Sequence, residues 1–344
     1  MIRDYFNFID DSWQSPDIGG GMNSRCDSGW RSIFAIILTL SILIPVVTIC
    51  SVSASDNLYG MQARNDHYLV IGKVSEDPKK HYGNLKPIAD YAVRHMGDLG
   101  VTESKVLFAR DNRMMINFLN QGKVDWVTET PFSAMEFVNQ TGAKILLRRW
   151  KKGVPEYRTV FFALKTSGIK SLTDLKGKTI AFEDPGSTSS FLLPSATLIQ
   201  SGLQLVELAT PREKPPAHMV GYVFSRNEVN APAWVYRGFV DAAAFSNLDW
   251  EDRDRMLDSI RDQVEIFYQT PAVPRALELV RKNLSPQIAV RLKQVLLRAD
   301  SDPKAAAALK AYKKTTRFDE LGTDDMERIQ HIESLSEIIK AKLR

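Results

Sequence analysis

Cysteine is nearly absent from this sequence. Only two of the 344 residues are cysteines, Cys26 and Cys50, and both lie near the N-terminus. Because the chain after residue 50 has none, that part cannot contain a disulfide framework or a thiolate metal site. The five histidines show no spacing typical of a metal site. We therefore expect a protein without metal or cofactor.

An excess of charge is also lacking. The net charge is only +4, and 44% of the residues are hydrophobic, which is typical of one large or two medium globular domains. The basic residues are spread out, so we expect no nucleic-acid partner. The densest basic cluster, residues 148–152, is interpreted as a solvated edge or a hinge loop, with a docking surface as the alternative.

Only one long run of hydrophobic residues is present. Residues 33–50, IFAIILTLSILIPVVTIC, carry no charge, and Val52-Ser53-Ala54 provides a small-residue cleavage pattern. Together they predict a signal peptide over residues 33–54. Eighteen apolar residues can also span a bilayer, so an uncleaved signal anchor with membrane contact through residues 33–50 stays open. Lipidation at Cys50 is a third possibility.

The residues before this run are unlike a signal-peptide start, because residues 1–32 form a long segment that contains five aspartates. They are interpreted as an N-terminal extension or a mis-assigned start, with Met22 as the alternative first residue. Arg25 and Arg31 would then form the usual basic leader. Every one of these options exports the rest of the chain, so we expect a periplasmic or other extracytoplasmic protein.

Strand and helix patterns alternate along the body, which predicts an α/β fold with mostly parallel sheets. The expected strands cover residues 68–74, 105–109, 124–127, 144–149, 157–164, 178–182, 220–223 and 238–245. The expected helices cover residues 84–96, 112–121, 131–139, 191–199 and 228–236, and the tail over 285–344 is expected to be helical.

One phrase occurs twice, which indicates two related lobes. A helix is followed by Gly-x-Val-Asp and a strand at residues 122–125 and again at 238–241. We expect a first lobe from residues 66–156 and 246–344 and a second lobe from 157–245. Open α/β sheets bind ligands beyond the carboxyl ends of their strands, so the cleft between the lobes is the expected binding site.

The stretch FEDPGSTSSFLLPSATLIQSG, residues 182–202, combines a turn with a row of hydroxyls before an apolar helix. Ser187, Thr188 and Ser189 are typical helix caps. A helix N-terminus with free N–H groups and hydroxyls is also a ready anion-binding site, so these three residues are candidate ligand donors. The glycine spacing does not match a nucleotide-binding P-loop.

Other candidates come from strand ends. Glu129 and Thr130 follow the third expected strand, and residues 246–249 follow the last. Tyr157 lies at the crossing between the lobes. The alternative interpretation of these residues is simple turn formation or hinge packing.

Several longer motifs carry a family resemblance over roughly residues 66–320. They are VSEDPKK (74–80), PIADY (87–91), GKVD (122–125), YRTV (157–160), SGIKSLTDLKGK (167–178), DPGSTS (184–189) and GFVDA (238–242). With these motifs the chain resembles the periplasmic solute-binding proteins of phosphonate-, phosphite- and phosphate-type ABC importers. The resemblance implies a two-lobe fold of the type II periplasmic binding proteins and a small oxyanion held by the hydroxyls at 187–189. It also implies an ABC permease in the inner membrane as partner.

Two positions depart from the family pattern. Ser190 stands where the family usually has glycine, and Asn227 stands where it often has a ligand-binding histidine. Asn227 can donate a hydrogen bond but cannot become cationic, so it is a candidate ligand donor, with helix capping as the alternative. Glu129 would repel an anion unless it binds a ligand amine or a protonated oxygen.

The leading hypothesis is thus an exported binding protein, not an enzyme. A membrane-anchored ligand sensor with the same fold is one alternative. A serine-dependent hydrolase is a weaker one, because the hydroxyl-rich turn lacks the Gly-x-Ser-x-Gly elbow and no motif places a histidine as base.

Overall fold

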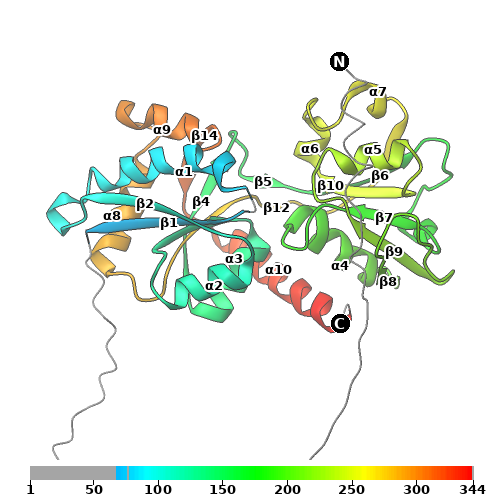
Figure 1. Ribbon diagram of the computed structural model, residues 1–344, viewed down its shortest axis with the longest axis horizontal. Helices are drawn as coiled ribbons and strands as arrows, with labels where there is room; N and C mark the ends of the chain where they lie inside the picture. Colours follow the sequence, from blue (N-terminus) through cyan, green and yellow to red (C-terminus); the bar gives the residue numbers. More distant parts are fainter. Residues whose placement is uncertain (1–66, 76, 343–344) are drawn as a thin grey trace, which may run out of the picture. The chain divides into compact units, whose positions relative to one another are not determined.

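Two six-stranded sheets organise the part of the chain that the computed structural model describes, residues 67–75 and 77–342 (Figure 1). Each sheet forms the centre of one lobe. The expected extension over residues 1–32 and the expected signal peptide or anchor over 33–54 lie outside the described residues. Within the described residues, no helix has the length and apolar character needed to cross a membrane.

The sheet of the first lobe has the strand order β14-β4-β13-β3-β1-β2. Its strands are β1 (Tyr68–Val74), β2 (Glu103–Ala109), β3 (Trp126–Glu129), β4 (Lys144–Lys151), β13 (Leu277–Val280) and β14 (Thr315–Asp319). β1 pairs in parallel with β2 and β3, but β13 runs antiparallel between β3 and β4. The expectation of a mostly parallel sheet is therefore wrong for this lobe, because the chain returns from the second lobe to fill the centre of the sheet.

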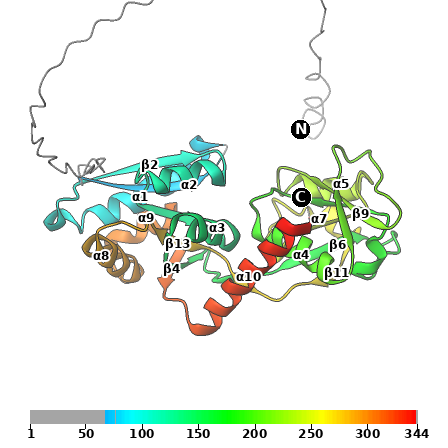
Figure 2. The same ribbon diagram turned by 90° about the horizontal axis from the view of Figure 1, so that it is seen from below.

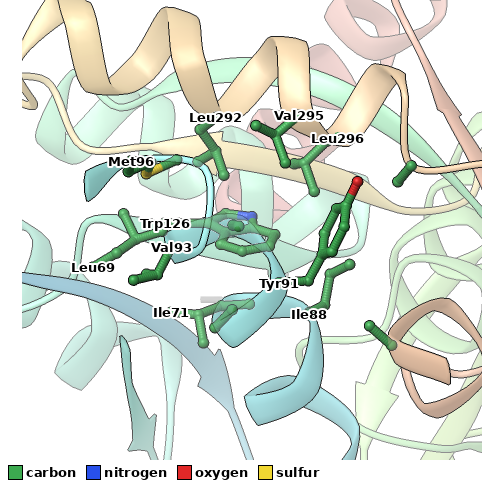
Figure 3. Close-up of a cluster of buried hydrophobic side chains, with 14 of the residues drawn as sticks. Leu69, Ile71, Ile88, Tyr91, Val93, Met96, Trp126, Leu292, Val295 and Leu296 are labelled. Carbon is green, nitrogen blue, oxygen red and sulfur yellow. The ribbon is translucent and has the colours of Figure 1, made fainter. Parts of the chain in front are cut away.

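Helices cover both faces of this sheet. They are α1 (Pro78–Val93), α2 (Asn112–Asn120), α3 (Pro131–Thr141), α8 (Pro286–Leu297) and α9 (Ala306–Ala311), with short 3-10 helices at Gly97–Leu99 and Pro303–Ala305. On one face, Tyr91 of α1 and Leu292 of α8 pack over the fully buried Trp126 of β3 (Figure 3). On the other face, Met115 of α2 and Phe137 of α3 are fully buried.

The sheet of the second lobe has the order β11-β6-β10-β7-β9-β8. Its strands are β6 (Thr159–Leu164), β7 (Thr179–Phe182), β8 (Gln204–Glu207), β9 (Met219–Phe224), β10 (Ala242–Ser246) and β11 (Val264–Gln269). Its helices are α4 (Leu193–Gln200), α5 (Asn230–Tyr236), α6 (Asn247–Glu251) and α7 (Asp258–Arg261), with a 3-10 helix at Leu172–Leu175. Because β11 pairs with β6, this sheet continues to Gln269, past the lobe boundary at residue 245 expected from the sequence.

Two short strands connect the lobes. β5 (Glu156–Tyr157) carries the chain into the second lobe and β12 (Val273–Pro274) carries it back. The two strands pair antiparallel, with Val273 opposite Tyr157. Two paired crossings of this kind are a typical hinge for lobe closure.

The C-terminal helix α10 (Thr323–Lys342) belongs to both lobes. Ile329 packs in the core of the first lobe, whereas Ile332, Leu335 and Ile339 pack in the core of the second. Figure 2 shows the helix, in red, running from one lobe to the other. The sequence-based boundaries assigned this whole tail to the first lobe.

Candidate functional site

A cavity of about 720 Å³ lies between the lobes at the carboxyl ends of the strands. The first lobe contributes the ends of β1, β3 and β4, and the second contributes the ends of β7, β9 and β10. Its lining includes Lys73, Asp111, Glu129, Thr130, Ser133, Glu136, Arg149, Lys151, Tyr157, Glu183, Ser187, Ser189, Arg226, Glu228, Asp249, Arg255 and Arg275. The cavity is therefore where open α/β sheets bind their ligands.

The hydroxyl-rich turn enters α4 through one wide turn of π-helix, Thr188–Leu192. The N–H of Leu192 donates to the carbonyl of Ser187 at 3.0 Å, and the hydroxyl of Ser187 accepts from the N–H of Ser190 at 3.1 Å. Ser187 thus caps the helix, as the alternative interpretation predicted, and it also lines the cavity. Single π-turns within α-helices are frequent at functional sites.

The neighbouring hydroxyls have separate surroundings. Ser189 lines the cavity, and its hydroxyl lies near the Tyr157 phenol. Thr188 is fully buried and does not line the cavity; its hydroxyl accepts from the N–H of Phe132, at the start of α3, at 3.0 Å. That bond joins the two lobes. Ser190 is also fully buried, and its hydroxyl has no partner in the described chain.

Glu129 and Thr130 lie at the end of β3, as predicted, and both line the cavity. A carboxylate oxygen of Glu129 accepts from the Lys73 ammonium at 3.1 Å and from the N–H of Val74 at 3.0 Å. This ion pair neutralises the carboxylate. The repulsion between Glu129 and an anionic ligand, which the sequence analysis expected, is therefore removed. Thr130 precedes α3, and its side chain makes no cap hydrogen bond.

Tyr157 lies on the hinge strand β5 and lines the cavity. Burial raises the pKa of its phenol, so it stays protonated and is a hydrogen-bond donor at neutral pH. The hydroxyl lies near Thr188 and Ser189 without a hydrogen bond of ordinary geometry within the described residues. Asn227, in contrast, is exposed outside the cavity, and its side chain accepts from the N–H of Val229 at 3.2 Å, which is a local cap.

Three cations that the sequence did not predict as site residues line the hinge side of the cavity. Arg149 and Lys151 come from the end of β4, and Arg275 follows the hinge strand β12. A guanidinium nitrogen of Arg275 donates to the carbonyl of Lys151. Burial, together with Arg149 and Arg255, lowers the pKa of Arg275 to about 10. The sequence could have indicated two of these site residues. Arg149 and Lys151 occupy positions i and i+2 at the end of a strand, and such positions share one face of the strand.

Acids gather on the opposite wall, in the second lobe. The Arg255 guanidinium binds Glu228 at 3.1 Å and also binds Asp249. Glu183 lies beside them without a cation. Burial and the nearby Glu228, Asp249 and Asp184 carboxylates raise the pKa of Glu183 to about 8, so this carboxyl group is mostly neutral at pH 7. Throughout the described chain, no group of three or more His, Cys, Asp or Glu residues could hold a metal ion.

The comparisons with known proteins agree with this architecture. A family described as "ABC transporter, phosphonate, periplasmic substrate-binding protein" matches residues 75–326. The chain is similar to the phosphate-import protein PhnD of Mycolicibacterium smegmatis, with 36% identity over 133 residues. That match covers 37% of this chain and spans 40% of the length of the relative.

Solved structures match over the whole body. XAC2383 from Xanthomonas citri, in structures bound to chloride or to ATP, is 36% and 35% identical, with a TM-score of 0.77. These matches cover 80–81% of this chain and 99–100% of that one. PhnD1 from Prochlorococcus marinus, in complex with methylphosphonate, shares the fold, with a TM-score of 0.59 at 20% identity. The match covers 99% of PhnD1 and 80% of this chain.

Proposed function

Because the chain belongs to the family of periplasmic substrate-binding proteins of phosphonate ABC transporters, we propose that its cleft captures a small phosphorus oxyanion and presents it to an ABC permease. The family is extracytoplasmic and consists of binding proteins, not enzymes. The family therefore argues against the hydrolase alternative. An uncleaved anchor at residues 33–50 would tether the same binding protein to the membrane.

The observation that carries this proposal is the meeting of two helix N-termini at one cavity. The start of α3, with Thr130 and Ser133, lines it from the first lobe, and the turn before α4, with Ser187 and Ser189, lines it from the second. Helix N-termini favour anions, because their first N–H groups lack helical partners and the helix dipole is positive there. Closing the lobes would surround an oxyanion with such donors.

The relatives support a phosphoryl ligand as a class, but they differ in the compound that each is named for or was solved with. One is a phosphate-import protein, one was solved with methylphosphonate, and one was solved with ATP. The chemistry they share is a tetrahedral phosphorus centre with several anionic oxygens. Hydroxyl donors and the Tyr157 phenol can bind such oxygens without becoming charged.

A thermal-shift panel on the purified protein tests the proposal. The panel contains phosphate, phosphite, methylphosphonate, aminoethylphosphonate, ATP, sulfate and several amino acids. A ligand at about 100 times its dissociation constant adds about 2.7 kcal/mol to the free energy of unfolding. We expect at least one phosphorus compound to raise the melting temperature and the amino acids to have no effect.

The double substitution Ser187→Ala/Ser189→Ala should remove most of that ligand-induced shift. Ser201→Ala is the matched control, since Ser201 caps the far end of the same helix and lies outside the cavity. No response to any phosphorus compound, or an unchanged shift in the double variant, would disprove this use of the cleft.

A further inference from the structure

Two cations on the hinge side of the cavity form no salt bridge within the described residues. Neither Lys151 nor Arg275 has a carboxylate within 4 Å among the described residues. Burial, together with the charges of Arg275, Arg149, Lys73 and Lys313, lowers the pKa of Lys151 well below its ordinary value, so the ammonium lacks a partner that would stabilise it. Both are more than half buried, so water compensates their charges only in part.

Most acids of the cavity are paired elsewhere. Glu183 is mostly neutral, Asp184 accepts from the N–H of Gly186, and Asp249 acts on Arg275 only from beyond salt-bridge distance. Glu129 binds Lys73, and Glu228 and Asp249 bind Arg255.

Glu278, fully buried behind the cavity, binds Arg149 at 3.3 Å and accepts from Trp126, Thr128 and Tyr312. Asp111 caps α2 and pairs with Arg110, and Glu136 accepts from Asn112. On the hinge side, Arg275 and Lys151 therefore form no salt bridge within the described chain, and only an added anion would stabilise the charged form of Lys151.

Both cations sit where the lobes meet. Lys151 ends the last strand before the first crossing, and Arg275 directly follows the strand of the second crossing. Arg275 donates to the Lys151 carbonyl, which holds its guanidinium beside the Lys151 backbone. The Tyr157 phenol, near Ser189 of the hydroxyl-rich turn, is also close enough to Arg275 to interact with its charge. An anion held by the hydroxyls and the Tyr157 phenol would thus feel the charge of Arg275, and Lys151 lines the same cavity.

We propose that Lys151 and Arg275 are specificity residues that make the cleft select a doubly charged phosphoryl group, such as a phosphate monoester or a phosphonate dianion, over a singly charged oxyanion of the same shape. The inference rests on the proposed function. Two like charges in a poorly solvated site repel each other. A dianion pairs with both groups and keeps Lys151 protonated. A monoanion leaves Lys151 either as an unpaired buried cation, which is costly, or as a neutral amine that attracts the anion less.

The experiment compares methyl phosphate with methyl sulfate by isothermal titration calorimetry at pH about 7.5, where a phosphate monoester with a second pKa of about 6 is doubly charged. Methyl sulfate has the same shape and one charge. We expect methyl phosphate to bind at least about tenfold more tightly, the effect of roughly 1.4 kcal/mol. Lys151→Met and Arg275→Met should each reduce this ratio several-fold by weakening the binding of methyl phosphate.

Lys144→Met is the matched control, because Lys144 is an exposed lysine at the other end of β4 and does not line the cavity. The ratio of its affinities for methyl phosphate and methyl sulfate should equal that of the unmodified protein. The ligand-free Lys151→Met protein should melt at the same or a higher temperature, since the substitution removes charge repulsion. A purely structural role of Lys151 would instead lower the melting temperature and weaken both anions equally.

Equal binding of methyl phosphate and methyl sulfate, including no binding of either, would overturn the charge selection. The proposed function would survive that result as long as another phosphorus compound of the thermal-shift panel binds. If no compound of that panel binds, the proposed function itself fails, so the two failures are distinct.

Discussion

Single residues in the cleft have roles that their neighbours decide. Glu129 is neutralised by Lys73, and Ser187 caps a helix while it faces the cavity. Glu183 differs from these, because its neighbours are other carboxylates and it has no cation. Its protonation state therefore links the cleft to pH.

We predict that Glu183→Gln stabilises the ligand-free protein at alkaline pH. The pKa of Glu183 is about 8 in the folded protein but about 4.3 in the unfolded chain. Between these values the folded state holds the extra proton, so the contribution of Glu183 to the free energy of unfolding falls as pH rises and levels off above pH 8. Glutamine does not titrate, so it removes this fall. Relative to the unmodified protein, the variant should gain roughly 1 kcal/mol or more in the free energy of unfolding between pH 4 and pH 8.

Thermal unfolding at a series of pH values from 4 to 9 measures this effect. The melting temperatures of the variant and the unmodified protein should agree near pH 4 and diverge above it. Glu251→Gln, an exposed site on α6 of the same lobe, is the control. Parallel curves over the whole range would contradict the raised pKa.

At the scale of elements, α10 couples the two lobes. Its apolar positions 329, 332, 335 and 339 follow one face of the helix, and that face reaches the cores of both lobes. Polar contacts hold it along the way: Arg328 binds Glu156 of the hinge at 2.6 Å, and Asn139 of α3 donates to Glu333 at 2.9 Å. The helix therefore limits how far the lobes can move apart while it stays docked.

We predict that Leu335→Ala lowers the free energy of unfolding by about 2–5 kcal/mol, the usual cost of emptying a buried leucine site. Leu335 is only 4% exposed in the core of the second lobe. Met326→Ala on the same helix is the control, since Met326 is 37% exposed and should cost much less. Chemical denaturation measures both, and similar losses would show that α10 is not docked as described.

At the scale of the whole binding unit, contacts across the cleft stabilise a closed arrangement. The Thr188 hydroxyl accepts from the N–H of Phe132 at 3.0 Å, and Lys152 binds Asp252 at 3.1 Å. The hinge between the lobes consists of only two short paired strands. Opening the cleft therefore requires mainly that these contacts break and that the packing of α10 changes. Ligand binding and lobe closure are thus linked.

We predict that Thr188→Val shifts the ligand-free protein toward an open arrangement and weakens phosphoryl-ligand binding several-fold. Valine keeps the volume of threonine but removes a hydrogen bond that contributes about 0.5–1.5 kcal/mol. Small-angle X-ray scattering with and without phosphate measures the opening. Thr197→Val is the control, because that hydroxyl bonds only within α4, to Leu193 at 2.7 Å. An unchanged radius of gyration and affinity in Thr188→Val would refute the link.

The sequence by itself determined the local elements and the family. β1 was predicted with its observed bounds, and the strand, turn and helix around Ser187 were found where expected, because apolar runs and turn residues act locally. The strands β8, β11, β13 and β14 were missed. They are short, and their partners lie far away in the chain, so local pattern carries little information about them.

Only the tertiary structure decided the charges of the site. Lys151 and Arg275 are 124 residues apart in sequence, and the pairing of β5 with β12 brings them together. The neutralisation of Glu129 by Lys73, 56 residues away, likewise depends on the pairing of β1 with β3. A sequence names the titratable groups, but which of them are compensated depends on distances that exist only after folding.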